Sequence, residues 1–248
     1  MMTLRAITFD LDDTLWDNRG VMARTETGHY AWLDERLAAW LAHRGETHLG
    51  RFAERFPLEA YQAGRRELAE RYPLRRGDFS WLRERALVAL LEAFGLPRSA
   101  AWLWAAATMA RFHELRLAVS PHPEVEPLLT ELGGRYRLGA ITNGNLALHR
   151  LALRRHFRVA IAAGEIQAPK PDARPFLAAL ARLATPPSRA LHVGDSWQED
   201  VLPALRLGMR AAWIAPDTPH AGELPDGAYR LQHVRELPAL IDRLEREG

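Results

Sequence analysis

The chain of 248 residues contains no cysteine. This absence excludes disulfide bonds, thiolate zinc sites and cysteine nucleophiles, and it fits the reducing cytoplasm, where we expect the protein to act. Uninterrupted apolar runs of about 18 residues, the length that spans a membrane, are lacking as well. The apolar run near the N-terminus is too short for a signal peptide. We therefore expect a soluble protein with no membrane partner.

Lysine is almost absent too. Lys170 is the only lysine among 33 basic residues, so 33 minus 1 leaves 32 arginines. A lysine ammonium is a compact point charge and fits beside a small anion in a narrow site, where the wide guanidinium of arginine does not. Either position 170 requires an amine, or one lysine has persisted by chance in an arginine-rich composition.

Neither sign of charge is in large excess, because 33 basic residues face 31 acidic ones and leave a net charge of +2. Acidic and basic residues are interspersed, so a sequence pI of 9.3 does not predict a nucleic-acid partner. The arginine pair Arg65 and Arg66 is expected on a solvated helix face. A composition of 48% hydrophobic and 26% charged residues excludes disordered and fibrous classes.

Short apolar runs with the pattern of buried strands recur along the chain, at residues 4–9, 138–141, 159–162, 190–193 and 211–214. After residue 133 they alternate with helical patterns that begin near residues 146, 172 and 198. This alternation predicts an α/β fold with a parallel sheet. Helical periodicity between these regions predicts an insert of about four helices. We expect a core of residues 1–17 and 119–248 and an all-helical insert of residues 18–118.

Polar residues follow the expected strands. Asp10 and Asp12 come after the first strand, and Thr142, Lys170 and Asp195 come after later ones. In parallel sheets, ligands bind outside the carboxyl ends of the strands, where these side chains would meet. Carboxylates gathered there repel unless a cation neutralises them, and Mg²⁺ prefers oxygen ligands. We predict a Mg²⁺ site with Asp10 and Asp195 as direct ligands.

The same residues have the chemistry for phosphoryl transfer. Asp10 is the candidate nucleophile, forming an aspartyl phosphate. Asp12 would protonate the leaving group and then deprotonate water. Thr142, beside backbone N–H groups, would bind phosphoryl oxygens, and Lys170 would offset their charge. Taken singly, each group also fits an ordinary turn or helix cap.

These segments resemble the four motifs of the haloacid dehalogenase superfamily: FDLDDTL at 9–15, ITNG at 141–144, KPD at 170–172 and GDSWQED at 194–200. The resemblance implies a Rossmann-like core of parallel strands flanked by helices, with the insert as a helical cap of the C1 type. It also implies Mg²⁺ dependence and the aspartyl-phosphate cycle. The backbone carbonyl of Asp12 would be a further metal ligand, and Asp200 would lie behind the ligands, steering a metal-bound water or Lys170.

More narrowly, FDLDDTLWDNR at 9–19, RTE at 24–26 and LHVGD at 191–195 are similar to bacterial phosphatases acting on flavin mononucleotide and 5-amino-6-(5-phospho-ribitylamino)uracil. This implies a small phosphate ester of the riboflavin pathway as substrate. Asn143, Asn18 and Arg19 are candidate substrate contacts. Asn18 and Arg19 could instead form a structural hinge between the core and the insert. The oligomeric state is left open.

Several alternatives remain at this point. A broad-specificity sugar or nucleotide phosphatase, or a phosphomutase, would share every motif. A dehalogenase would use Asp10, but the resemblance there calls for a non-acidic residue at position 12. A catalytically silent binding protein would lack a nucleophile, an acid or a metal ligand, and the sequence retains all three.

Two further features have a packing and a functional interpretation. The tryptophans of the insert would either stack on a planar substrate ring or pack within the protein, which we favour; they are Trp32, Trp40, Trp81, Trp102 and Trp104. His192 lies inside an expected strand and is predicted to be a packed core residue rather than a proton shuttle.

Overall fold

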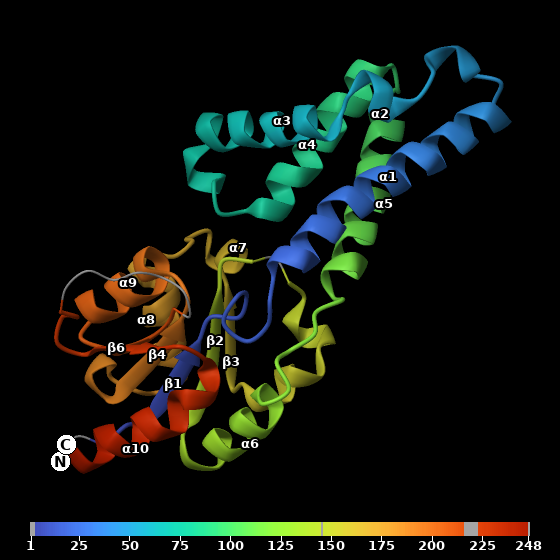
Figure 1. The fold of residues 1–248 in the computed structure, drawn as a ribbon. Coiled ribbons are helices and arrows are strands. Elements are labelled where there is room, and N and C mark those ends of the chain that lie inside the picture. The colour runs from blue at the N-terminus through green and yellow to red at the C-terminus, as the bar shows by residue number, and fades with distance from the viewer. Residues whose placement is uncertain (1–2, 145, 216–222, 248) are drawn as a thin grey trace. The chain divides into compact units, whose positions relative to one another are not determined.

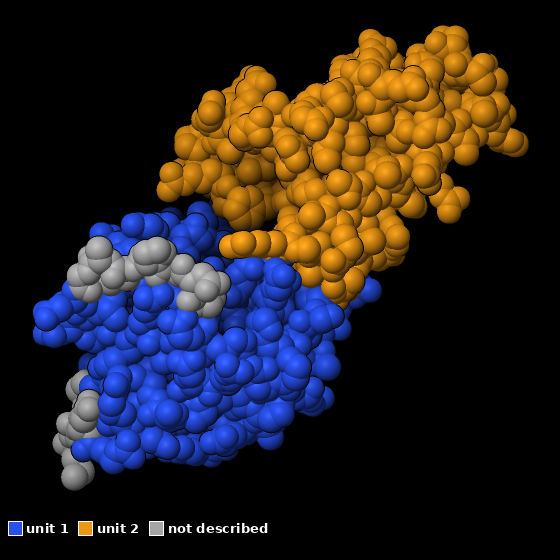
Figure 2. All heavy atoms as spheres, viewed as in Figure 1, with its two compact units in different colours: residues 1–18, 119–248 blue, residues 19–118 orange. Residues whose placement is uncertain are grey.

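The computed structural model describes residues 3–144, 146–215 and 223–247. The chain divides into two compact units, which Figure 2 distinguishes by colour. The first contains residues 1–18 and 119–248, and the second contains residues 19–118. The first unit is an α/β unit and the second is entirely helical among its described elements.

A parallel sheet of six strands forms the centre of the α/β unit. The strands are β1 (Ala6–Phe9), β2 (Arg137–Thr142), β3 (Val159–Ala162), β4 (Ala190–Gly194), β5 (Arg210–Ile214) and β6 (Ala228–Leu231). Their order across the sheet is β3-β2-β1-β4-β5-β6. The predicted Rossmann-like α/β class is therefore confirmed.

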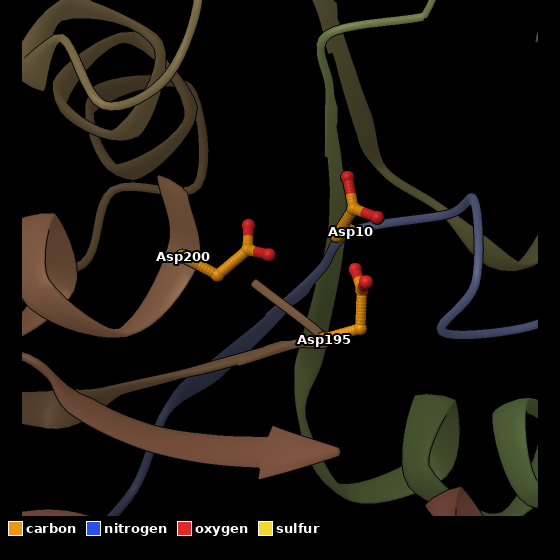
Figure 3. Close-up of side chains that lie close together, drawn as sticks. All are labelled: Asp10, Asp195 and Asp200. Carbon is orange, nitrogen blue, oxygen red and sulfur yellow. The ribbon is translucent and has the colours of Figure 1, made fainter. Parts of the chain in front are cut away.

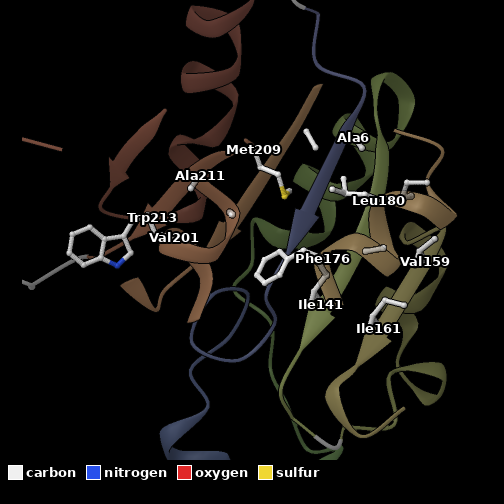
Figure 4. Packing of buried hydrophobic residues seen from close by; sticks show 14 of the residues in the cluster. Ala6, Ile141, Val159, Ile161, Phe176, Leu180, Val201, Met209, Ala211 and Trp213 are labelled. Atoms are coloured by element: carbon white, nitrogen blue, oxygen red, sulfur yellow. The ribbon is translucent and has the colours of Figure 1, made fainter. Parts of the chain in front are cut away.

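Helices cover both faces of this sheet (Figure 1). One face carries α6 (Val125–Arg135) and α10 (Leu237–Glu247), and the other carries α8 (Ala173–Arg182) and α9 (Leu202–Arg206). Phe176, Ile141 and Leu180 belong to the buried hydrophobic cluster between the sheet and its helices (Figure 4). Burying a side chain such as Phe176 contributes about 2 kcal/mol, so this packing fixes the strands beneath the site.

The strand order itself predicts where a ligand binds. β1 pairs with β2 on one side and with β4 on the other, so the order reverses between β1 and β4. In open parallel sheets, the crevice at such a reversal lies at the carboxyl ends of the strands. Asp10 and Asp195 immediately follow β1 and β4.

The helical unit contains α1 (Arg19–His43), α2 (Phe52–Arg55), α3 (Leu58–Arg71), α4 (Phe79–Phe94) and α5 (Arg98–Arg116). Local sequence explains the ends of α4. Before its first residue, the Asp78 side chain accepts a hydrogen bond from the backbone N–H of Trp81. After its last residue, Gly95 adopts φ +118°, which favours glycine. A separate hydrophobic core, including Leu37, Leu91 and Phe112, holds these helices together.

The tryptophans of this unit pack within it. Trp104 lies 6.4 Å from Trp32 and 5.9 Å from Trp40, measured between ring centroids. Trp81 packs edge-on against Tyr72, and the Arg85 guanidinium lies over the ring of Trp102. The favoured packing interpretation is therefore confirmed, and stacking on a substrate ring is an alternative that these contacts do not test. Among the described helices, none is long and apolar enough to cross a membrane.

Two predicted helices differ from the fold, and two elements were not predicted. Residues after 146 form two 3₁₀ turns, Leu148–Arg150 and Ala152–His156, instead of a helix. The buried leucines at 146, 148 and 153 are two and five residues apart, a spacing that one helix face does not accommodate. The helix expected near 198 begins as a π-helical turn, Trp197–Val201. The strand β6 and helix α10 were not predicted.

The expectation of a solvated face for Arg65 is wrong. Its side chain is only 19% exposed and donates a hydrogen bond of 2.8 Å to Oε1 of Glu26. The same oxygen accepts a bond of 2.7 Å from Arg83. One carboxylate thereby joins α1, α3 and α4.

Candidate active site

Asp10 occupies the end of the central strand. Its backbone N–H donates to the carbonyl oxygen of Val193 at 2.8 Å, which ties it to β4. Because side chains alternate along a strand, Asp10 continues the face that carries Ala6 and Thr8. Its side chain is 8% exposed, so the carboxyl group is almost fully removed from water.

The carboxyl groups of Asp10, Asp195 and Asp200 converge (Figure 3). One oxygen from each lies within 4.8 Å of the others. Asp10 follows β1, Asp195 follows β4, and Asp200 lies on the π-helical turn. Like charges this close disfavour their own ionisation unless cations neutralise them. The cluster therefore fits a metal ion.

Lys170 supplies one cation at this cluster. Its Nζ donates to Oδ1 of Asp10 and to Oδ1 of Asp200, each at 2.5 Å. Burial acts to lower the pKa of Lys170, but the two carboxylates outweigh it and raise that pKa above its usual range. The ammonium is therefore retained. One positive charge against three carboxyl groups leaves a negative excess that a divalent ion would neutralise.

The carboxyl groups differ in how well their charge is stabilised. Burial raises the pKa of Asp10 well above its usual value, against the opposing effect of Lys170. Burial and the neighbouring Asp200 carboxylate raise the pKa of Asp195 to about 6. Burial acts on Asp200 in the same direction, but Lys170 and His192 lower its pKa below the usual range. Asp10 and Asp195 are thus the groups that lack a full complement of positive charge.

Asp200 is held by bonds to the protein. Its Oδ1 lies 3.0 Å from Nε2 of His192, and its Oδ2 accepts from the backbone N–H of Ser196 at 3.0 Å. The Asp200 side chain fills the space beside Gly194. A Cβ atom added to Gly194 would lie 2.3 Å from Cγ of Asp200, so only glycine fits there. Because both oxygens of Asp200 accept hydrogen bonds, Asp10 and Asp195 remain the predicted metal ligands, with Asp200 predicted to lie behind them.

Asp12 lies two residues beyond Asp10 in a tight loop. Its Oδ1 accepts a hydrogen bond of 2.9 Å from Nε1 of Trp16, which orients the carboxyl group. The loop is closed by the backbone N–H of Leu15, which donates to the carbonyl oxygen of Leu11 at 2.9 Å. Asp13 adopts φ +58°, a conformation that aspartate tolerates better than most residues.

Thr142 ends β2, beside β1 in the sheet. Its Oγ1 accepts a bond of 2.9 Å from the backbone N–H of Gly144, and its side chain is buried. Asn143 clamps the main chain of Lys170: its Oδ1 accepts from the Lys170 N–H at 2.7 Å, and its Nδ2 donates to the Lys170 carbonyl at 3.0 Å. Asn143 also donates to Glu199. The structure thus gives Asn143 a role in placing Lys170, and its predicted substrate contact stays a prediction.

Asn18 ends the first segment of the α/β unit, and Arg19 begins the helical unit. The backbone N–H of Asn18 donates to Oδ1 of Asp13 at 2.9 Å, which braces the loop. Arg19 begins α1 in the helical unit and is exposed. Their contact with a substrate stays a prediction.

The predicted burial of His192 is confirmed, but sequence reasoning missed its hydrogen bonds and one further support of the site. Nε1 of Trp213 on β5 donates to the backbone carbonyl of Asp195 at 2.8 Å. Thr8 and His192 hydrogen-bond to each other across neighbouring strands. The available signal was a polar residue inside each of two otherwise apolar runs, two positions before Asp10 and three before Asp195.

Comparison with known proteins identifies the family. A model of the haloacid dehalogenase-like hydrolases matches residues 4–208. The 5-amino-6-(5-phospho-D-ribitylamino)uracil phosphatase YigB of Escherichia coli K12 is 31% identical over 214 residues, which cover 86% of this chain and 84% of the relative. A phosphoserine phosphatase of Thermus thermophilus is 36% identical over 159 residues, or 60% of each chain.

A solved structure agrees in fold and in sequence. A crystal structure described as a 2-haloacid dehalogenase from Pseudomonas syringae pv. Tomato DC3000 superposes with a TM-score of 0.84. It is 34% identical and covers 98% of this chain and 100% of its own. The family match spans the strands that end at Thr142 or just before Asp10 and Asp195. This chain belongs to the haloacid dehalogenase-like hydrolases and, with its phosphatase relatives, is a phosphatase of that family.

Proposed function

We propose that this phosphatase hydrolyses a small phosphomonoester in two steps, with the phosphoryl group carried on Asp10. The observation that carries the proposal is the Lys170 ammonium, which lies 2.5 Å from Oδ1 of Asp10 while Asp195 adds a further carboxylate to the same cluster. A nucleophilic carboxylate, a fixed cation and an excess of oxygen ligands are the requirements of this chemistry.

The donor set fits Mg²⁺. Asp10 and Asp195 offer carboxylate oxygens, and the backbone carbonyl of Asp12 is a further proposed ligand. All are hard oxygen donors, and the chain has no cysteine thiolate to favour a softer metal. When bound, Mg²⁺ would neutralise negative charge shared between these carboxylates and the substrate phosphate.

In the first step, an Asp10 oxygen attacks phosphorus and the phosphorus–oxygen bond to the alcohol breaks. The departing alkoxide takes a proton from the Asp12 carboxyl group. The bond from Trp16 orients Asp12 for this transfer. Lys170 and the Thr142 hydroxyl bind phosphoryl oxygens and offset the charge that develops on them.

In the second step, the Asp12 carboxylate accepts a proton from water, and the resulting hydroxide oxygen bonds to phosphorus. The bond between phosphorus and Asp10 breaks, which releases inorganic phosphate and restores the Asp10 carboxylate. Asp200 and Asn143 keep Lys170 in place through both steps by the bonds already described.

Flavin mononucleotide or 5-amino-6-(5-phospho-ribitylamino)uracil is the substrate we propose. The support is the similarity of residues 9–19 and 191–195 to that subgroup, together with 31% identity to the E. coli phosphatase acting on the ribitylaminouracil ester. The helical unit would act as a cap that closes over a small substrate and excludes water. Asn18 and Arg19, at the junction of the two units, would contact the leaving group.

Dehalogenation is the second candidate, because the similar P. syringae protein is described as a 2-haloacid dehalogenase. A halide ion leaves without taking up a proton, so a dehalogenase would not need Asp12 as a general acid. The acidic residue at position 12, oriented by Trp16, therefore favours phosphate esters.

The test is phosphate release with and without Mg²⁺ across flavin mononucleotide, the ribitylaminouracil ester, pyridoxal phosphate, nucleotides and sugar phosphates. Chloride release from 2-chloropropionate is measured in parallel, and Asp10→Asn is the blank. Preference for the flavin or ribitylaminouracil ester would support the proposed substrate. A flat phosphate profile would indicate a broad-specificity enzyme, and chloride release without phosphatase activity would overturn the proposal.

A further inference from the structure

Two polar residues face each other inside the hydrophobic part of the sheet. Thr8 on β1 and His192 on β4 are register partners, and Oγ1 of Thr8 lies 2.9 Å from Nδ1 of His192. Thr8 is 0% exposed and His192 is 1% exposed. Burying two polar side chains costs free energy of folding unless their hydrogen bonds are satisfied. The presence of this pair beneath the active site therefore calls for an explanation.

The second ring nitrogen of His192 connects this pair to the site. Nε2 lies 3.0 Å from Oδ1 of Asp200, the oxygen that also accepts from Lys170. Lys170 in turn donates to Asp10. A continuous set of hydrogen bonds therefore runs from Thr8 to the proposed nucleophile.

For a neutral imidazole, only one proton arrangement satisfies every member of this set. Burial lowers the pKa of His192 against the opposing effect of Asp200, which favours the neutral ring with one donor and one acceptor. The ionised Asp200 carboxylate only accepts, so Nε2 of His192 must carry the proton. Nδ1 then accepts from the hydroxyl of Thr8. Thr8 thereby fixes the tautomer that makes His192 a donor to Asp200.

We infer that His192, set by Thr8, is a positioning residue that orients the Asp200 carboxylate so that the Lys170 ammonium lies against Asp10. The inference rests on the proposed roles of Asp10 and Lys170. Asp200 accepts from three donors, of which His192 is a rigid ring on the central sheet. Phe176 packs edge-on against that ring, with centroids 4.9 Å apart, and limits its rotation.

Packing alone would not require a histidine at this position. A leucine would fill much of the same space against Phe176, but it would leave the Thr8 hydroxyl and Oδ1 of Asp200 each with one partner fewer. Asp200 would then keep its bonds from Ser196 and Lys170 but lose the rigid donor that sets the angle of its carboxylate, and Lys170 would shift with that carboxylate. Replacing His192 should therefore change the environment of the Lys170 ammonium, although the two residues are connected only through Asp200 in this set of hydrogen bonds.

The single lysine makes this effect measurable. A lysine-selective nitrogen label on the full chain reports one side-chain ammonium, that of Lys170. We expect His192→Leu to shift the Lys170 signal and lower kcat by about tenfold with a smaller change in KM. His192→Gln retains an amide donor toward Asp200, so the Lys170 signal and kcat should both stay close to their wild-type values. Thr8→Val should move the signal in the same direction by less.

Leu191→Val is the matched control, because Leu191 is equally buried on β4 but belongs to no part of this hydrogen-bond set. It should lower stability without moving the Lys170 signal. An unchanged signal in folded His192→Leu and Thr8→Val would overturn the inference, as would an equal shift in the control. If the wild-type protein hydrolyses no phosphate ester, the proposed function fails, while the position of the Lys170 signal still decides whether His192 orients the cluster.

Discussion

Each of the two compact units contains a buried ion cluster, and the two clusters are opposite in sign. In the α/β unit, the Lys170 cation lies between the carboxylates of Asp10 and Asp200. In the helical unit, the Glu26 carboxylate lies between the guanidinium groups of Arg65 and Arg83. The side chains of Glu26 and Arg83 are 14% and 10% exposed, against 2% for Lys170.

The difference in charge balance is the reason for proposing that the cluster at Lys170 carries the chemistry. At Lys170, carboxyl groups outnumber cations, and burial raises the pKa of Asp10. Such a site has incomplete charge compensation, so it can accept a metal ion and change protonation. In the helical unit, burial acts to raise the pKa of Glu26, but the permanently charged Arg83 and Arg65 lower it overall. That cluster favours its ionised form and joins three helices.

The largest expected effect comes from Asp10→Asn. An amide is a poor nucleophile and a poor metal ligand, so phosphate release should fall by more than about a thousandfold. The circular dichroism of the folded protein should be retained. A variant with substantial turnover would show that the cluster at Lys170 does not carry the chemistry.

Lys170→Arg should come next. The charge is kept, but the wide guanidinium does not fit a space in which Nζ lies 2.5 Å from two carboxylates. We expect kcat to fall by about a hundredfold, which corresponds to about 2.7 kcal/mol of transition-state stabilisation. Near-normal kcat would mean that any cation suffices, and that the solitary lysine has no special role.

Glu26→Gln should affect stability instead of chemistry. The change leaves Arg65 and Arg83 without their shared carboxylate, and we expect the free energy of unfolding to fall by about 2 kcal/mol. Urea denaturation measures this loss. Glu35→Gln on the exposed face of the same helix is the matched control and should change stability by less than about 0.5 kcal/mol.

The loss at Glu26 should also depend on pH. Because the pKa of Glu26 is lower in the folded protein than its ordinary value of 4.5, its contribution is present above pH 4.5 and is lost as pH falls through the folded pKa. Wild type and Glu26→Gln should therefore converge in stability in acid. A difference that persists there would show that the Glu26 charge is not the cause.

The smallest effect concerns Asp195 and the metal. Mg²⁺ at about ten times its Kd should stabilise the wild type by about 1.4 kcal/mol, seen as a rise in Tm. Asp195→Asn should lose most of this rise. Without metal, the same variant should be at least as stable as wild type near neutral pH, because burial raises the pKa of Asp195 to about 6 and its ionisation opposes folding. An unchanged Mg²⁺ response would remove Asp195 from the ligand set.

The sequence predicted those parts of the molecule that follow from strand periodicity. Runs ending before Asp10, Thr142 and Asp195 identified parallel strands, whose carboxyl ends meet at one edge of a sheet. The same rule predicted that Asp10, Lys170 and Asp195 would lie close together. Asp172 likewise begins the predicted helix, with its side chain accepting from the backbone of Arg174.

The features that the sequence did not predict depend on register and packing. Thr8 meets His192 only because β1 and β4 pair with that alignment, which periodicity does not specify. Arg65 meets Glu26 across 39 residues, through the packing of α3 against its neighbours. The segment after residue 146 has leucines in abundance but lacks the helical spacing that burial there requires.

The most direct test of the account traps the phosphoryl group on Asp10. Asp12→Asn with para-nitrophenyl phosphate should pass the first step, because nitrophenolate leaves without an acid, and stall in the second, which needs the Asp12 base. The mixture is quenched in acid with Mg²⁺ present, and peptides are analysed by mass spectrometry. We predict a phosphoryl group on Asp10. An unmodified Asp10 in a variant that has released a full equivalent of nitrophenolate would contradict the account.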